Sequence, residues 1–335
     1  MNKIPAFIII LLIAIFSWNC NNEDEAIKIG LLMDDFIQER WSKDREIFIK
    51  KAKELNAKVI TQSSKGDKDL QLTQAREMID KGIDVLVLVA VDMTAASEIV
   101  KIAHQSDVKV IGYDRLIKKC DLDLFVSFDN ARIGEMQAGY FVKLIPKGNY
   151  ALIGGPVIDN NSIQIRQGQI NILQPFIDKG DIRLVMDKHV NEWDDEQGYK
   201  AMLECLMKNT CHVVLCANDA LARGAIKAIE ERKLTGTIAV AGQDAEKDAL
   251  ERIVKGTQTI TIYKPIETIA SNAALLAVKL ATESKLNDAG FVTISNDFKM
   301  VPTMLFNPML VNRETVKMTL SADTTLNPKH IFVEP

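Results

Sequence analysis

The sequence predicts an α/β fold of two similar Rossmann-like lobes, each built on a parallel sheet. Short apolar runs alternate with segments of helical periodicity along the chain, and this rhythm occurs twice. Polar side chains follow the ends of the apolar runs, as in Ile238–Ala241, which is followed by Gly242-Gln243-Asp244 and then by a helical pattern from Ala245 to Val254. Parallel sheets of this kind hold ligands beyond the carboxyl ends of their strands.

The first set of elements occupies the N-terminal part of the chain. In the helix predicted over Lys43–Leu55, the spacing of Ile47, Phe48, Ala52 and Leu55 places all four on one face. The predicted strands are Ile27–Met33, Val59–Gln62, Val85–Val89, Val108–Tyr113 and Leu124–Phe128, with further helices over Leu70–Ile79 and Ala95–His104.

The second set repeats this order. It comprises helix Ile133–Leu144, strand Tyr150–Ile153, helix Ile163–Phe176, strand Ile182–Met186, helix Glu196–Met207, strand His212–Cys216, helix Ala220–Glu231 and strand Ile238–Ala241. Helix Thr268–Thr282 and segment Met300–Leu305 are left over, and we expect each to complete the opposite lobe. The first lobe is then 20–130 plus 265–296 and the second is 131–264 plus 297–335, with hinge crossings near Asn130, Lys264 and Asn296.

The composition is that of an ordinary globular protein. The 335 residues are 47% hydrophobic and 26% charged, with a formal net charge of −4. Because nucleic-acid-binding proteins carry a basic surface, this mildly acidic chain is not expected to bind nucleic acid.

The first 19 residues have the pattern of a signal peptide. Lys3 precedes the apolar run Ala6–Phe16, which is shorter than the roughly 20 residues of a membrane span. Cys20 then resembles a lipobox cysteine, although Trp18 and Asn19 replace the small residues usual before it. A lipoprotein anchored through Cys20 is the preferred interpretation, ahead of an uncleaved anchor or a released protein. All three place the body outside the cytoplasm.

Four further cysteines lack the spacing of a metal site. Cys120, Cys205, Cys211 and Cys216 contain no Cys-x-x-Cys pair, and no metal or cofactor is expected. Cys205 and Cys211 could pair across a helix-to-strand turn in an oxidising compartment, but buried free thiols are the simpler interpretation.

Polar and aromatic side chains follow seven predicted strands, the last of which is Thr259–Tyr263, and we expect them to meet at one edge of the two sheets. Any single one of them has a simpler explanation as a helix cap or a solvated loop residue, but seven such strand ends together favour a binding site. These side chains are Arg40, Trp41, Asp114, Arg115, Asn160, Asn161, Arg166, Trp193, Asn218, Asp219, Gln243, Asp244 and Lys264.

This set of side chains suits a neutral polyol. Carboxylates accept hydroxyl protons, guanidinium groups donate in a fixed geometry, and amides do both. Trp41 and Trp193 offer flat apolar faces to a sugar ring. Three aspartates, Asp114, Asp219 and Asp244, offset the cationic groups and leave little surplus charge for a phosphate.

Catalytic motifs are missing from the sequence. It has no GxxxxGK[ST], GxGxxG or GxSxG pattern, and the four histidines are scattered. We therefore do not expect an enzyme.

The same residues resemble the periplasmic sugar-binding proteins of ABC importers, which have a type I two-lobed fold. The resemblance covers about Ile27 to Leu310, and Glu39-Arg40-Trp41 with Tyr113-Asp114-Arg115 is its most selective part. The other matching pieces are Asp34-Asp35, Lys43-Asp44-Arg45, Ser127-Phe128-Asp129-Asn130, Asp159-Asn160-Asn161 with Arg166, Ala217-Asn218-Asp219-Ala220, Gly242-Gln243-Asp244-Ala245, Gly256-Thr257-Gln258-Thr259 and Tyr263-Lys264-Pro265-Ile266.

The resemblance implies a pyranose held between the lobes, with D-xylose as the expected sugar and an importer permease as the partner. It implies hydrogen bonds from Arg40, Asp114, Arg115, Asn161, Arg166, Asn218, Asp244 and Lys264, with Trp41 and Trp193 packed on the ring. Leu221-Ala222-Arg223 and Ile163-Gln164-Ile165 depart from the family pattern, so the helices beside the site are expected to pack differently. A sugar-sensing domain for a chemoreceptor or sensor kinase is the alternative, because both roles use lobe closure.

Overall fold

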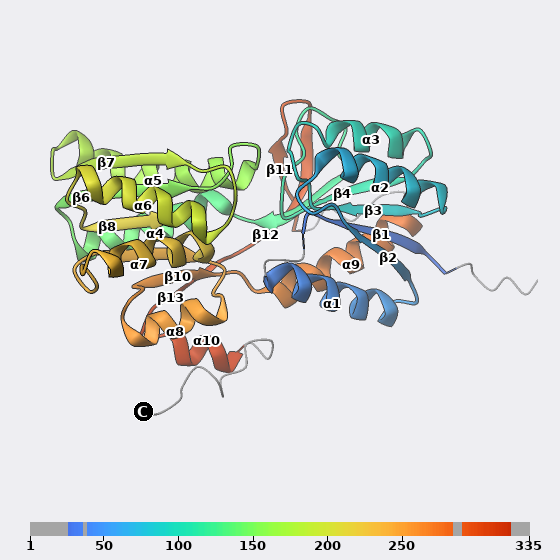
Figure 1. Cartoon of the computed structure of the whole chain (residues 1–335). Helices are drawn as coiled ribbons and strands as arrows, with labels where there is room; N and C mark the ends of the chain where they lie inside the picture. Colours follow the sequence, from blue (N-terminus) through green and yellow to red (C-terminus); the bar gives the residue numbers. More distant parts are fainter. Residues whose placement is uncertain (1–25, 36–38, 284–289, 323–335) are drawn as a thin grey trace, which may run out of the picture.

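The computed structural model describes residues 26–35, 39–283 and 290–322 (Figure 1). The predicted signal peptide and Cys20 lie outside these residues. Within the described part of the chain, no helix has the length and apolar character needed to cross a membrane. The chain forms two α/β lobes that lie side by side in Figure 1, which confirms the predicted fold class.

The first lobe is built on a seven-stranded sheet. Its strands lie in the order β11 (Val292–Ser295), β12 (Met300–Phe306), β5 (Leu124–Phe128), β4 (Lys109–Tyr113), β3 (Val85–Leu88), β1 (Lys28–Met33) and β2 (Lys58–Ser63). β11 pairs antiparallel with β12, and the other pairs in this sheet are parallel. The central strands are buried on both faces, as expected of a parallel sheet.

The second lobe is built on a six-stranded sheet. Its order is β13 (Met309–Val311), β10 (Ile260–Tyr263), β9 (Ala239–Gln243), β8 (Val213–Cys216), β6 (Gly148–Gly154) and β7 (Ile182–His189). Only β13 is antiparallel to its neighbour among these strands.

Helices cover both sheets. In the first lobe α1 (Glu39–Glu54) packs against α9 (Ile266–Thr282), and α2 (Lys68–Asp80) packs against α3 (Ser97–His104). Phe48 and Ala52 of α1 are buried, as their spacing predicted, while Ile47 is only partly buried. The α1–α9 pair and the α2–α3 pair lie on opposite faces of the sheet in Figure 1.

Six helices belong to the described part of the second lobe. They are α4 (Asn130–Leu144), α5 (Asn160–Asp178), α6 (Asp195–Lys208), α7 (Asp219–Glu231), α8 (Lys247–Lys255) and α10 (Val316–Ala322). Of these, α5 and α7 begin at polar residues beside the cleft. The side chain of Asp159 caps α5 through Asn161 N, and Asn218 caps α7 through Leu221 N. The chain runs from β6 outward to the edge strand β7 and then back past β6 to β8. Because both crossovers are right-handed, α5, which connects β6 to β7, and α6, which connects β7 to β8, lie on opposite faces of the sheet.

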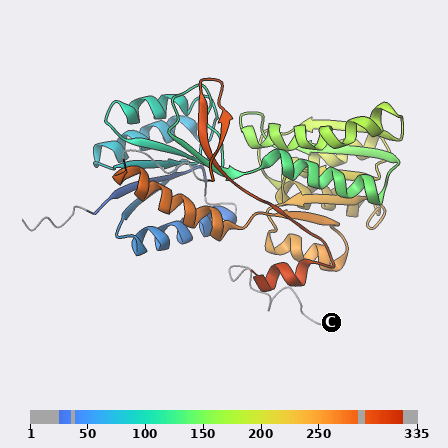
Figure 2. The same ribbon diagram turned by 180° about the vertical axis from the view of Figure 1, so that it is seen from behind.

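Within the described residues, three segments cross between the lobes, from β5 to α4, from β10 to α9 and from β12 to β13 (Figure 2). The prediction that Met300–Leu305 belongs to the second lobe, with a crossing near Asn296, was wrong. This strand pairs in parallel with β5, Thr303 opposite Phe125, and Val301 is buried in the core of the first lobe. The third crossing therefore follows Phe306, and β11 forms a hairpin with β12 that the sequence pattern did not predict.

Candidate cleft between the lobes

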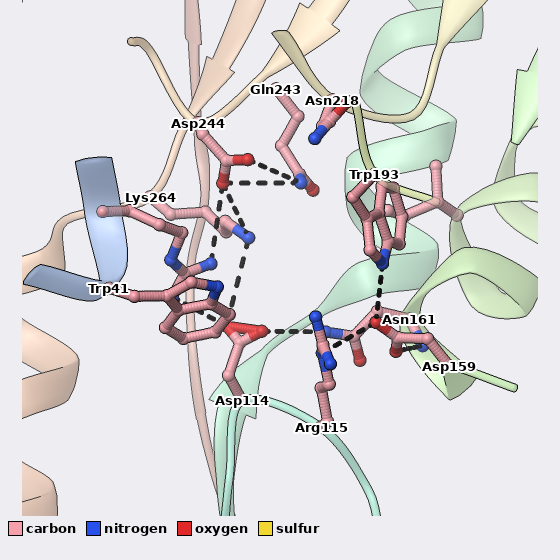
Figure 3. A pocket seen from close by; sticks show the side chains of 12 residues that line it. Trp41, Asp114, Arg115, Asp159, Asn161, Trp193, Asn218, Gln243, Asp244 and Lys264 are labelled. Carbon is pink, nitrogen blue, oxygen red and sulfur yellow. Dashed lines mark hydrogen bonds and ion pairs between the residues drawn. The ribbon is translucent and has the colours of Figure 1, made fainter. Parts of the chain in front are cut away.

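A polar cavity lies between the two lobes, at the carboxyl ends of the strands (Figure 3). Strand ends and helix starts of both lobes supply its walls. The lining residues are Arg40, Trp41, Asp114, Arg115, Asp159, Asn161, Ile165, Trp193, Asn218, Gln243, Asp244 and Lys264.

Nine of the ten site residues implied by the family resemblance line this cavity, and Arg166 does not. Arg166 forms an ion pair with Asp187, and the hydrogen bonds that it donates to this carboxylate raise its pKa. The helical period explains the difference: Asn161 and Ile165 are four residues apart and share the face that lines the cavity, whereas Arg166 lies about 100° further round.

Three lining residues were absent from the ten implied by the family resemblance, although Gln243 was among the strand-end side chains expected at this edge. Asp159 was part of a matching motif, and its place before α5 was a detectable capping signal. Gln243 follows Gly242 at the end of β9, where polar side chains were already expected to gather. Ile165 gave no signal of its own, because it reads as an ordinary core residue until the face of α5 is known.

Opposite charges alternate across the floor of the cavity. Arg40 Nη2 lies 2.9 Å from Asp114 Oδ2, and its Nη1 lies 3.6 Å from Asp244 Oδ1. Lys264 Nζ lies 2.9 Å from the same Asp244 oxygen. All of these side chains are at least nine-tenths buried, so their charges are weakly screened by solvent.

The cations keep the carboxylate of Asp114 ionised. Burial alone raises the pKa of Asp114, but Arg40, followed by Lys264 and Arg115, lowers it to about 2. For Arg40, burial lowers the pKa, and the carboxylates of Asp114, Asp44 and Asp244 more than reverse that effect. Asp114 and Arg40 therefore present fixed charges to the cavity at neutral pH.

Contacts between the lobes close the cleft on one side. Arg115 Nε lies 2.8 Å from Asp159 Oδ2, and Asn161 Nδ2 donates to Asp114 Oδ1 at 2.8 Å. The Met93 N–H donates to the Ile158 carbonyl at 2.9 Å, also from one lobe to the other. The polar groups of the site thus bridge the two sheets.

Two indole rings from different lobes face the cavity. Trp41 on α1 is buried, and the guanidinium carbon of Arg40 lies 4.1 Å from its ring centroid. Trp193 precedes α6 and donates from Nε1 to Asp159 Oδ2 at 3.2 Å. Figure 3 shows these rings on opposite sides of the charged groups.

A buried acceptor remains free for a ligand. Gln243 Oε1 accepts no hydrogen bond from the described residues, although it is shielded from solvent. An unpaired buried acceptor costs free energy, which a ligand hydroxyl would recover. Carboxylates, amides, guanidinium groups and indole faces together can bind a molecule that is rich in hydroxyl groups and has an apolar ring face.

Two α/β lobes around a cleft lined with charged and aromatic side chains define a two-lobed solute-binding protein. The chain belongs to the periplasmic binding protein domain family, whose model matches residues 29–285. This relationship places it among solute-binding proteins rather than enzymes.

Individual relatives are similar over nearly the whole chain. The D-xylose-binding periplasmic protein of Escherichia coli K12 is 41% identical, covering 96% of this chain and 97% of the relative. The protein of the same description from Haemophilus influenzae is also 41% identical, covering 93% of each chain. A carbohydrate transporter solute binding protein from Chloroflexus aurantiacus, solved in complex with D-glucose, superposes with a TM-score of 0.84 at 27% identity. That superposition covers 92% of this chain and 99% of the other.

Proposed function

We propose that this protein captures a monosaccharide, D-xylose, between its two lobes and delivers it to an ABC sugar importer. The observation that carries the proposal is the convergence of nine residues, implied by resemblance to sugar binders, on one cavity. The 41% identity to two D-xylose-binding periplasmic proteins supports the choice of sugar.

Each lining residue has a role that follows from its chemistry. Asp114 and Asp244 accept hydrogen bonds from sugar hydroxyls, while Arg40, Arg115 and Lys264 donate them. The amides of Asn161, Asn218 and Gln243 do both, and Asp159 holds Arg115 and Trp193 in place. Trp41 and Trp193 pack against the apolar faces of the ring.

Closure follows from contacts to both lobes. Arg40, Asp114 and Arg115 belong to the first lobe, whereas Asn161 and Asp244 belong to the second. A sugar that touches both sets has a higher affinity for the closed arrangement and shifts the population toward it. A closed, loaded protein is a suitable form for an importer permease to recognise.

We also propose that the mature protein is anchored at the outer face of a membrane by a lipid on Cys20. The signal-like run Ala6–Phe16 and the polar segment after Cys20 support this proposal. Intact mass of the membrane-extracted protein should show a lipid-modified Cys20 at the N-terminus. A Cys20→Ser variant should lose that mass and leave the membrane fraction; an unmodified cysteine in the parent would contradict the proposal.

A thermal-shift screen tests the sugar assignment. D-xylose at a hundredfold excess over its Kd should stabilise the folded protein by about 2.7 kcal/mol, because it binds only that state. Ribose 5-phosphate and amino acids should give much smaller shifts. A screen in which D-xylose is silent and one of these compounds stabilises the protein would overturn the proposal.

Two arginines provide a matched pair of variants for the same screen. Arg115→Ala removes a cation from the cavity wall and should abolish most of the D-xylose shift. Arg166→Ala removes a cation that faces away from the cavity and should leave the shift unchanged.

A further inference from the structure

The turn that carries Asp244 into the cavity has an unfavourable backbone conformation. Asp244 has φ 101° and Ala245 has φ 55°, values that residues other than glycine rarely adopt. Helix α8 therefore begins only at Lys247, later than the helical pattern from Ala245 predicted. Such a turn persists only where its surroundings fix it.

Two buried side chains hold this turn. Asp219, which is fully buried at the start of α7, accepts from the Glu246 backbone N–H through Oδ2 at 3.1 Å. Thr261 Oγ1 donates to the same carboxylate, 2.9 Å from Oδ2, and accepts from the Ala245 backbone N–H at 3.2 Å. Two successive N–H groups of the turn are thus bound by the Asp219–Thr261 pair.

Contacts to the second carboxylate oxygen, Oδ1, fix the position of the Asp219 side chain. Gln258 Nε2 donates to Oδ1 at 2.8 Å. The β9 backbone also passes so close that a Cβ at Gly242 would lie 1.9 Å from Oδ1. Asp219 does not act as the cap of α7, because Asn218 fills that role through its bond to Leu221 N.

Asp219 does not line the cavity, whereas Asp244 does, with Oδ1 2.9 Å from Lys264 Nζ. We propose that Asp219, with Thr261, is a positioning residue for sugar binding: it holds the Asp244 turn so that the Asp244 carboxylate faces the ligand. This inference rests on the proposed sugar-binding function. It gives the buried Asp219 side chain a role in ligand affinity, in addition to its contribution to folding.

A double-mutant cycle tests the proposal by calorimetric titration of the full chain with D-xylose. Asp219→Asn has nearly the same shape as the parent residue and should raise the Kd at least tenfold. Asp244→Asn keeps an oxygen in the cavity, so that binding stays measurable. In that background Asp219→Asn should change the Kd less than twofold, because the group that it positions is already altered.

Further variants separate positioning from general stability. Thr261→Val removes the hydroxyl at constant shape and should weaken binding as Asp219→Asn does, while Thr261→Ser should keep the parent Kd. Asp178→Asn, an acid-to-amide change on the exposed surface of α5, is the matched control and should bind like the parent. Parent affinity in both Asp219→Asn and Thr261→Val would overturn the proposal, and so would fully additive losses in the cycle.

Amide hydrogen exchange provides a readout without sugar. Asp219→Asn should speed exchange at Glu246, whose N–H donates to the Asp219 carboxylate, and at Ala245, whose acceptor Thr261 Oγ1 is itself held by that carboxylate, and it should leave α5 unchanged. Unchanged exchange at both positions would contradict the proposed anchoring of the turn. Failure of the sugar assignment is recognised separately, because the parent protein would then give no heat with D-xylose.

Discussion

Gly155 sets the position of the Trp193 indole, and Gly155→Ala is a sharp test of the cavity wall. A Cβ at Gly155 would lie 2.3 Å from the Cη2 atom of Trp193 and 2.5 Å from two neighbouring ring atoms. Ordinary contact begins near 3.4 Å, so the ring must retreat by roughly 1 Å or the strain must be absorbed elsewhere. Because Trp193 lines the cavity, a displacement of its ring changes the wall that the sugar contacts.

The expected cost follows from overpacking. Forcing one extra carbon into a packed contact destabilises the folded protein by about 1 to 3 kcal/mol. A sugar that must push the displaced ring back on binding loses up to this free energy, so the Kd for D-xylose should rise by at most roughly 5- to 150-fold. Calorimetric titration measures this change. Gly139→Ala on α4 is the control, since a Cβ there meets no atom within 4 Å, and its Kd should match the parent. A Gly155→Ala variant that binds D-xylose within twofold of the parent would refute the placement of Trp193 as a wall of the site.

Three further predictions concern closure, pH and the thiols. Small-angle scattering should give a smaller radius of gyration with saturating D-xylose than without it; an unchanged radius with confirmed binding would contradict ligand-driven closure. Burial, followed by Asp244 and Asp248, raises the pKa of Glu246 from 4.5 to about 7. Protonated Glu246 therefore stabilises the folded protein below pH 4.5, and this stabilisation is lost as the pH rises through 7. The melting temperature of Glu246→Gln should accordingly fall less between about pH 5 and pH 8 than the melting temperature of the parent protein. An equal fall in both proteins would contradict this effect. Cys120, Cys205, Cys211 and Cys216 are buried and free in the structure, so a thiol reagent should modify them only after unfolding; two unreactive thiols in unfolded, unreduced protein would instead indicate a Cys205–Cys211 disulfide.

The strands and helices of both lobes were predictable because their local patterns are strong. Buried strands such as Val85–Leu88 are continuous apolar runs, and α1 has a clear apolar face. The assignment of β12 failed for a physical reason: a single apolar strand fits either sheet, and only its pairing with β5 decides between them. Pairing over such a long sequence separation leaves no local pattern.

The lining of the cavity was predictable as a set of strand ends, but the layer of residues behind it was not. Residue type and position after a strand were enough to find Asp114 and Asp244. They could not show which face of α5 meets the cavity, so Arg166 was placed in the site although it pairs with Asp187. Nor could they show that Asp219 lies behind Asp244, because that arrangement depends on the left-handed turn between β9 and α8.

Calorimetric titration of the purified protein with D-xylose tests the central claim most directly. Contacts from both lobes to one pyranose predict a single site per chain, with heat that disappears in Arg115→Ala and persists in Arg166→Ala. The absence of heat with D-xylose, under conditions where the folded protein binds another class of solute, would contradict the account.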